Sequence, residues 1–173
     1  MLQKVQERIG EFIYSCDDEE LVDVVAKKLM DKGLSLSSAE SCTGGMFAAA
    51  MTGVPGISEV FDRSLVTYSN EAKMQELGVR EETLKDYGAV SEETAREMAE
   101  GLHRVSGSDV CVSVTGIAGP GGGSAEKPVG LVYIGAFYRG KTVCRKIQMR
   151  NVNRNWNRNY AMLSMLDLIN KLV

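Results

Sequence analysis

Apolar side chains recur every three or four positions in six stretches of the chain, the spacing that gives a helix one apolar face. Capping side chains precede several of these stretches, and glycines follow several of them. The expected helices cover residues 2–14, a segment capped by Asp17 or Asp18 and ended by Gly33, residues 46–51, a segment from Ser69 or Asn70 to Leu77, a segment between Ser91 and Gly107, and a C-terminal segment with Met162, Met165, Leu166, Ile169 and Leu172 on its inner face.

Shorter apolar or alternating runs lie between these helices and predict strands. The expected strands cover residues 34–38, 61–68, 109–115, 131–137 and 142–148. The third run is continuous and rich in β-branched side chains, which is typical of a strand buried in the middle of a sheet. Arg139-Gly140 separates the last two runs and favours a hairpin. Strands that alternate with helices predict an α/β fold, a three-layer α/β/α sandwich around a mixed sheet.

The length of 173 residues suits one domain with a full core, and no repeat or linker divides the chain. We therefore expect a single domain over residues 1–173, in which residues 1–17 form an extra N-terminal helix. No apolar run reaches the roughly 18 residues of a membrane-spanning helix, and the N-terminus lacks a secretory apolar core. Four cysteines without CxxC spacing predict reduced thiols, a cytoplasmic location and no zinc site.

The net charge of −3 leaves no broad cationic field, so neither nucleic acid nor a membrane is an expected partner. Residues 145–158 are locally basic, which fits a solvated edge or a site for a small anionic ligand. His103 is the only histidine, and it lies among apolar residues at helical spacing. We interpret it as a structural residue on a helix flank, so that most zinc hydrolases and a Ser-His pair are disfavoured.

The segment Ala39-Glu40-Ser41-Cys42-Thr43-Gly44-Gly45 links an expected strand to an expected helix. Its glycines allow a sharp turn and the close approach of a ligand, and free amides at a helix start favour an oxyanion or a phosphate. Ser41 or Thr43 is therefore a nucleophile or simply a helix cap. Cys42 is a rival nucleophile, and packing beneath the helix is its alternative interpretation.

A serine nucleophile without a histidine requires another base, and lysine is the next candidate once burial lowers its pKa. Tyr68 ends an expected strand, and Asn70 and Lys73 follow on one face of the next helix. The ends of strands in open α/β sheets are where ligands bind. A solvated Lys73 and a Tyr68 in the core are the alternative.

A glycine-rich loop follows the expected central strand, from Thr115 to Gly123. It favours either a backbone wrapped around a phosphate or ribose, or a flexible loop tip. It lacks the GxGxxG order of a Rossmann site. Residues 135–142 fit the Walker A expression, but strand patterns lie on both sides, whereas a P-loop must open a helix. We therefore reject a P-loop there.

Five segments together resemble the CinA C-terminal domain family, in the family's order and from about Leu21 to the C-terminus. They are residues 39–45, 66–73, 88–91, 115–120 and 127–130. The resemblance implies an α/β/α sandwich around a mixed five-stranded sheet with one antiparallel strand. It also implies a nicotinamide-nucleotide amidase, which hydrolyses the carboxamide of nicotinamide mononucleotide to nicotinate mononucleotide and ammonia in pyridine-nucleotide salvage. It implies no metal and no organic cofactor.

The resemblance also implies roles for individual residues. Ser41 matches the nucleophile, Lys73 its base, and Tyr68 a tyrosine that relays or orients the proton. The positions that match the substrate-binding residues are Thr43, Gly44, Gly45, Asn70, Thr115, Gly116, Gly119, Gly121 and Gly122. The family's Gly-Asp-Arg turn is replaced here by Val152-Asn153-Arg154-Asn155, so either Arg154 or Arg158 is expected to hold the substrate's phosphate.

Three functional interpretations stay open at this point. The first is the amidase, with a small-molecule nucleotide as its partner. The second is a catalytically silent module that binds a nucleotide or a partner protein, and the third is a serine amidase for another small amide. The sequence leaves the oligomeric state open, and a homo-oligomer is compatible with it.

Overall fold

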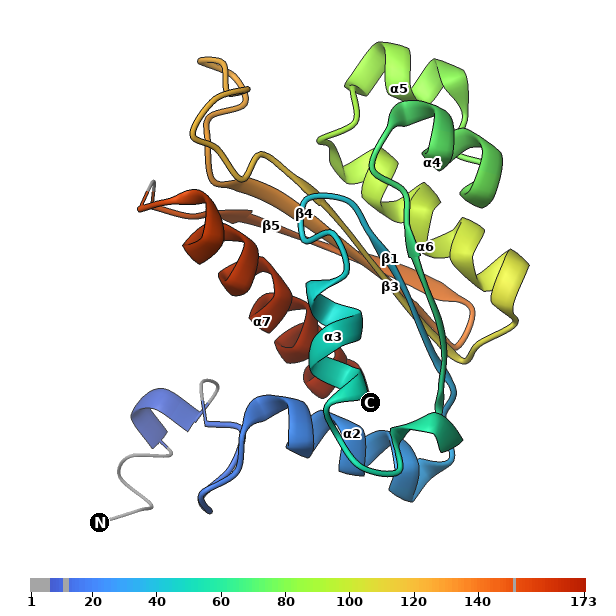
Figure 1. Ribbon diagram of the computed structural model, residues 1–173, viewed down its shortest axis with the longest axis vertical. Helices are drawn as coiled ribbons and strands as arrows, with labels where there is room; N and C mark the ends of the chain where they lie inside the picture. Colours follow the sequence, from blue (N-terminus) through green and yellow to red (C-terminus); the bar gives the residue numbers. More distant parts are fainter. Residues whose placement is uncertain (1–6, 11–12, 151) are drawn as a thin grey trace.

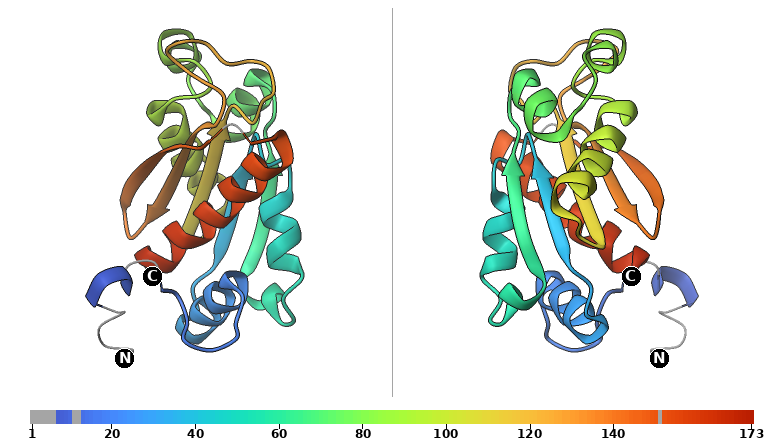
Figure 2. Two further views of the ribbon diagram at one scale, coloured as in Figure 1. Left: turned by 90° about the vertical axis from the view of Figure 1, so that its left-hand side faces the viewer. Right: turned by 90° about the vertical axis from the view of Figure 1, so that its right-hand side faces the viewer.

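A computed structural model describes residues 7–10, 13–150 and 152–173, and a five-stranded sheet runs through its centre (Figures 1 and 2). The strands are β1 Leu36–Glu40, β2 Phe61–Val66, β3 Val110–Gly116, β4 Leu131–Tyr138 and β5 Lys141–Gln148. The helices are α2 Leu21–Lys32, α3 Met46–Thr52, α4 Asn70–Leu77, α5 Glu81–Tyr87, α6 Glu92–Ser106 and α7 Arg154–Leu172, with a 3-10 turn over Ile57–Glu59.

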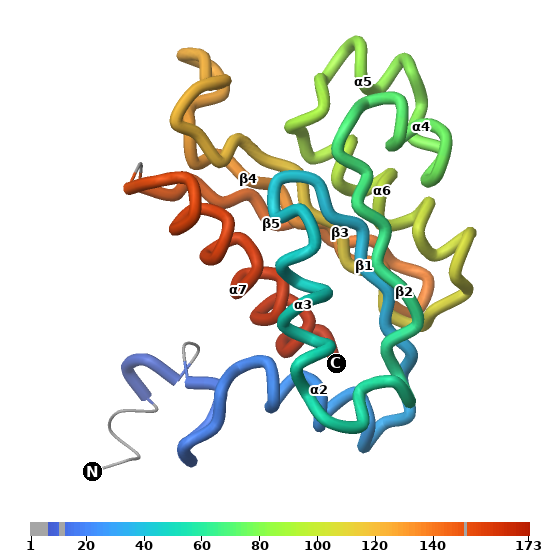
Figure 3. The backbone as a smooth tube through the Cα atoms, viewed as in Figure 1, coloured from blue at the N-terminus to red at the C-terminus, as the bar shows by residue number. Residues whose placement is uncertain are grey.

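The strands lie in the order β2-β1-β3-β4-β5. β1 pairs in parallel with both β2 and β3, whereas β4 pairs antiparallel with β3 and β5. The sheet is therefore mixed, with β4 as its one antiparallel strand, and the expected fold is confirmed. α3 and α7 cover one face, and α6 covers the other with α4 and α5 packed against it, which gives three layers (Figures 1 and 3).

Each face of the sheet carries its own apolar core. The larger cluster joins β1, β3 and β4 to α2, α3 and α7, and Phe47 and Met165 are fully buried in it. The smaller cluster lies beneath α4 and α6, where Met98 and Leu102 are fully buried. The layers on both faces explain why the central strands are buried on both sides.

The first expected strand is shifted in the structure. We expected residues 34–38, but β1 covers Leu36–Glu40, and every one of its residues is buried. Leu34 belongs instead to the end of α2: its amide bonds the carbonyl of Leu29, next to a left-handed Gly33. This hydrogen-bonded cap ends the helix and delays the strand by two residues.

The expected helix ends agree well with the structure, with differences near the N-terminus. Ser69 and Ser91 cap α4 and α6 through their side chains, as expected. Glu20, rather than Asp17 or Asp18, precedes α2, and its side chain makes no capping bond. Of the expected helix over residues 2–14, residues 7–9 are helical, residues 13 and 14 are not, and residues 1–6, 11 and 12 lie outside the described residues.

Two further features bear on function. Arg139 and Gly140 both have positive φ, 50° and 74°, as a two-residue hairpin turn between β4 and β5 requires. Residues 135–142 therefore form a hairpin, and the Walker A match there does not correspond to a P-loop, which would open a helix. Within the described ranges, no helix has the length and apolar character needed to cross a membrane.

Candidate active site

The C-terminal ends of the three parallel strands meet at one cavity. Ser41 follows β1, Tyr68 and Lys73 follow β2, and Thr115 lies at the end of β3. The cavity has a volume of about 210 Å³. Its lining consists of Ser41, Cys42, Tyr68, Lys73, Ala89, Val90, Thr115, Gly116, Ala118 and Arg154. The edge formed by strand ends is the place where open α/β sheets bind ligands.

Ser41 and Lys73 are in direct contact. The two residues are 32 positions apart in the sequence, yet Lys73 Nζ lies 3.1 Å from Ser41 Oγ. The Ser41 amide donates to the carbonyl of Val114, which anchors the serine to β3. Lys73 is 1% exposed and Ser41 is 8% exposed, so both groups are screened from bulk water. The distance lies within the range over which a proton passes between two groups.

The surroundings of Lys73 suit a neutral amine. Its Nζ lies 3.5 Å from the carbonyl of Ser69, and it donates at shorter range to the carbonyls of Thr67 at 2.8 Å and Tyr68 at 3.2 Å. A neutral amine has two N–H bonds and one lone pair. When the two N–H bonds point to those carbonyls, the lone pair remains for the hydroxyl hydrogen of Ser41.

The pKa of Lys73 is lowered to about 8, from an ordinary value of 10.5. Burial is the main cause, because it penalises the charged ammonium, and the neighbouring Cys42 opposes it. Near neutral pH a useful fraction of the amine is therefore neutral, as a base requires. No acidic side chain contacts the Lys73 amine in the described part of the chain, so no ion pair restores the pKa.

Cys42 is a poor nucleophile in this setting. Burial raises the pKa of its thiol to about 12. The thiolate, which is the reactive form, is therefore scarce at neutral pH. Cys42 also packs in the larger apolar cluster, in agreement with the packing interpretation.

The carboxylate of Glu40 accepts hydrogen bonds from the backbone amides at the start of α3. Glu40 is fully buried, and the donors are the amides of Gly45, Phe47 and Ala48 at 2.9–3.1 Å. We expected free amides at the start of this helix for an oxyanion or a phosphate, and that expectation is wrong for these three amides. A carboxylate at a helix N-terminus is favourable because it meets the positive end of the helix dipole. Gly45, at φ 94°, supplies the sharp turn between Ser41 and the helix.

Tyr68 and Arg154 lie together at the cavity. Arg154 donates from Nη2 to the Tyr68 hydroxyl at 3.1 Å and from Nη1 to the carbonyl of Gly119 at 2.8 Å. Tyr68 is 61% exposed, so its ring lies at the entrance and not in the core. The Tyr68 hydroxyl therefore contacts Arg154, while its carbonyl contacts Lys73.

The remaining candidate residues divide into two groups. Thr115 and Gly116 line the cavity, and the Thr115 hydroxyl donates to the carbonyl of Ala89 at 2.7 Å. Thr43 is buried behind the turn, and Asn70 is exposed to solvent. The candidates that do not line the cavity are Thr43, Gly44, Gly45, Asn70, Gly119, Gly121 and Gly122.

Sequence reasoning assigned no role to Ala89 or Val90, and it included Ala118 only as part of the site-lining loop over residues 115–122 that the resemblance implies. Ala89, Val90 and Ala118 give the cavity an apolar side. They lie in segments that resemble the family, but a small apolar side chain carries no chemical signal by itself. Asn157 was also missed: it is 1% exposed, and its side-chain amide donates to the Ala118 carbonyl at 2.9 Å.

His103 lies at the other end of the sheet. Its Nδ1 is 2.9 Å from the carbonyl of Ser108, just before β3 begins, and its ring stacks on Phe137 at 4.0 Å. These contacts agree with a structural histidine. Across residues 7–10, 13–150 and 152–173, no group of three or more metal-binding side chains gathers in one place.

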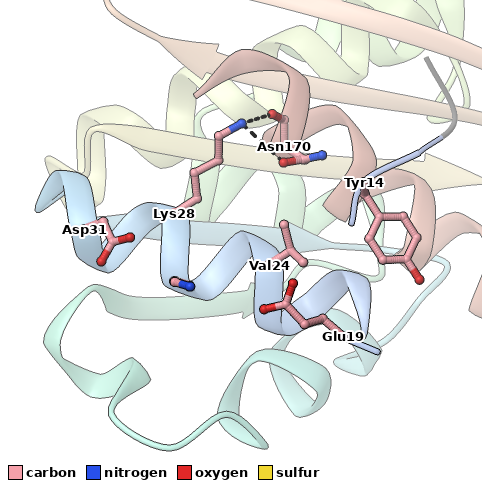
Figure 4. Close-up of a pocket in the computed structure, with 7 residues that line it drawn as sticks. Tyr14, Glu19, Val24, Lys28, Asp31 and Asn170 are labelled. Atoms are coloured by element: carbon pink, nitrogen blue, oxygen red, sulfur yellow. Dashed lines mark hydrogen bonds between the residues drawn. The ribbon is translucent and has the colours of Figure 1, made fainter. Parts of the chain in front are cut away.

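A second cavity, of about 310 Å³, lies between α2 and the C-terminal end of α7 (Figure 4). Lys28 donates there to the carbonyl of Asn170 at 2.6 Å and to its side-chain oxygen at 3.3 Å. The lysine thereby satisfies a carbonyl at the end of α7, a common structural role for cations. None of the residues that the sequence pointed to lines this cavity.

The chain is similar in sequence to known proteins over most of its length. The family model described as the CinA C-terminal domain matches residues 18–173. Two relatives described as competence-damage inducible proteins, from Acetivibrio thermocellus and Clostridium acetobutylicum, are 49% and 50% identical to the chain. These matches cover 98% and 99% of the chain but only 41% of the length of each relative.

Solved structures share the fold. The competence/damage inducible protein CihA from Agrobacterium tumefaciens superposes with a TM-score of 0.84 and is 41% identical, over 91% of this chain and 99% of that one. A CinA superfamily protein from Escherichia coli superposes with a TM-score of 0.82 and is 29% identical, over 95% of this chain and 97% of that one.

Proposed function

The chain belongs to the CinA C-terminal domain family, and we propose that it hydrolyses the carboxamide of nicotinamide mononucleotide to nicotinate mononucleotide and ammonia. The observation that carries the proposal is the 3.1 Å contact between Lys73 Nζ and Ser41 Oγ, two buried groups that line one cavity. A serine beside a neutral lysine has the two parts needed for acyl transfer, a nucleophile and its base.

In the first step Ser41 Oγ attacks the carboxamide carbon while the Lys73 amine accepts the hydroxyl proton. The carbonyl oxygen becomes an oxyanion, and the carbon becomes tetrahedral. The amide of Cys42 is the donor we propose for that oxyanion, because it follows the nucleophile and belongs to a residue of the cavity lining. A donor at this position typically contributes about 100- to 1,000-fold to the rate.

In the second step the Lys73 ammonium returns its proton to the amide nitrogen. The carbon–nitrogen bond breaks, ammonia leaves, and an acyl ester remains on Ser41. Water then attacks the ester with Lys73 again as base, which releases the carboxylate and restores the hydroxyl. The cycle needs neither a metal nor an organic cofactor, since serine and lysine supply the nucleophile, the base and the acid.

The cavity walls suit the proposed substrate. Ala89, Val90 and Ala118 offer apolar contact to a pyridine ring, and Arg154 offers a cation at the entrance for a phosphate. Arg158 is less suited to the phosphate, because it does not line the cavity, whereas Arg154 does. Of the two arginines that the sequence left open, we therefore propose Arg154.

The rate of ammonia release should depend on the protonation of Lys73. Because the neutral amine is the active base, kcat/KM for nicotinamide mononucleotide is expected to rise as the pH increases through about 8, and then to level off. Below that pH the rate should fall about tenfold per pH unit. The check is a pH–rate profile from ammonia release, with enzyme stability confirmed at each pH. A flat profile between about pH 6 and 10 would contradict a lysine base.

Substituting Arg154 by methionine is expected to weaken binding of phosphorylated substrate. We expect KM for nicotinamide mononucleotide to rise about tenfold or more, since a charge-assisted bond to phosphate is lost, with little change in kcat. Kinetics on nicotinamide riboside, which lacks the phosphate, provide the control and should change little. An equal rise in KM for the mononucleotide and the riboside would show that Arg154 does not bind the phosphate. Binding of the mononucleotide without any ammonia release by the unaltered protein would favour a silent binding module.

A further inference from the structure

The first two turns of α7 hold both loops that frame the cavity. Arg158 reaches the turn that carries Ser41, whereas Asn157 and Arg154 reach the glycine-rich loop. All of these contacts go from a side-chain N–H to a backbone carbonyl. One helix end therefore sets the position of the nucleophile turn relative to the opposite wall.

Arg158 makes two hydrogen bonds to the turn that follows Ser41. Its Nε donates to the carbonyl of Cys42 at 3.1 Å, and its Nη2 donates to the carbonyl of Thr43 at 2.6 Å. Peptide units are planar, and these two are trans, so the amides of Thr43 and Gly44 point away from the arginine. Two consecutive peptide planes are thus fixed immediately after the serine.

Asn157 acts in the same way on the opposite wall. Its side-chain amide donates to the carbonyl of Ala118, a residue that lines the cavity. The side chain is almost fully buried, and its own oxygen has no hydrogen-bond partner among the described residues. Burying a polar atom without a hydrogen-bond partner costs free energy, so we expect Asn157 to have a specific role.

We propose that Arg158 and Asn157 are positioning residues, which hold Ser41 at proton-transfer distance from Lys73 and in line with the cavity wall. Neither side chain lines the cavity, so they act through the backbone and not through substrate. The proposal rests on the proposed function, because it requires Ser41 to be the nucleophile. Displacement of a reacting group by about 1 Å costs on the order of 100-fold in rate, which sets the size of the expected effect.

The test uses Arg158→Met, Arg158→Lys and Asn157→Leu, with Arg145→Met as the matched control. Arg145 also ties α7 to the sheet, through a 2.6 Å ion pair with Asp167, but it lies away from the cavity. We expect Arg158→Met to lower kcat for ammonia release about 10- to 100-fold with KM changed less than about threefold. Arg158→Lys keeps a cation with N–H donors but lacks the planar guanidinium that reaches both carbonyls, so it should lose less than Arg158→Met, as should Asn157→Leu.

Two further readouts separate positioning from unfolding and from failure of the proposed function. The pH–rate profile of Arg158→Met should still rise near pH 8, because Lys73 stays buried. A rise shifted toward the ordinary lysine pKa of 10.5 would show that Lys73 is no longer buried, and it would overturn the proposal. The second readout is the rate at which a fluorophosphonate labels Ser41, measured by mass spectrometry without any nucleotide.

The labelling outcomes are distinct. If the unaltered protein labels at Ser41 and Arg158→Met labels about 10- to 100-fold more slowly while Arg145→Met matches the unaltered protein, the proposal is supported. If Arg158→Met labels as fast as the unaltered protein, positioning by Arg158 is wrong and the proposed function stands. If the unaltered protein is not labelled at Ser41, the assignment of Ser41 as nucleophile is wrong. Both the proposed function and the positioning role of Arg158 and Asn157 are then contradicted. A loss confined to KM for phosphorylated substrate would make Arg158 a phosphate ligand instead.

Discussion

Substituting Ser41 by alanine is expected to lower kcat for ammonia release from nicotinamide mononucleotide by about 10⁴-fold or more. The hydroxyl lies 3.1 Å from the Lys73 amine, and the proposed mechanism has no acyl intermediate without it. Nucleotide binding should persist, because Arg154 and the apolar wall remain. The measurement is steady-state ammonia release together with a titration of nucleotide binding.

Cys42→Ala provides the comparison within the same turn. Because burial raises the pKa of the thiol to about 12, we expect this variant to keep most of its activity. The backbone carbonyl that Arg158 grips is present in either residue. If Cys42→Ala were inactive and Ser41→Ala active, the nucleophile would be the cysteine.

Substituting Lys73 by methionine is the second change with a large expected effect. Removal of the base should lower kcat by about 10²- to 10⁴-fold, because Ser41 then has no acceptor for its proton. We expect the variant to remain folded. A lysine whose pKa is lowered to about 8 makes the folded state less stable below that pH, and the penalty fades as the pH rises toward 10.5. Methionine removes that penalty.

Lys73→Arg separates the base from the positive charge. Arginine stays protonated at all accessible pH values, so it should be about as inactive as methionine. The double variant Ser41→Ala, Lys73→Met should lose no more activity than Ser41→Ala alone, since residues that act as a unit are strongly non-additive. Independent, multiplying losses in ammonia release would mean that the two residues do not act in one step.

Local patterns predicted most of the architecture. Ser69 and Ser91 mark helix starts because a hydroxyl before a helix satisfies a free amide, and this signal needs no knowledge of the fold. The buried strand was equally clear from its continuous apolar run: residues 109–115 were expected, and β3 covers Val110–Gly116. α5 was not predicted, because only Thr83 and Leu84 are buried in it and no apolar stripe marks it.

The candidate site was predictable only in part. Ser41 and Lys73 were identified by type and by resemblance, but only the parallel pairing of β1 with β2 brings their segments together. Glu40 gave no signal because a carboxylate before a turn is usually solvated, whereas here it is buried against three amides. Asn157 was missed, and Arg158 was expected only as a phosphate ligand, because their partners are backbone carbonyls 39 to 116 positions away, which no local pattern indicates.

The most direct test of the account is the pKa of Lys73 in the intact protein. Lysine labelled with ¹³C at Cε can be followed by NMR as a function of pH, and Lys73→Met assigns the resonance by its disappearance. We expect a titration near pH 8, because burial removes the amine from water while Ser41 and backbone carbonyls are its hydrogen-bond partners. A Lys73 resonance that titrates near the ordinary value of about 10.4 would show a charged amine at neutral pH and would contradict the proposed base.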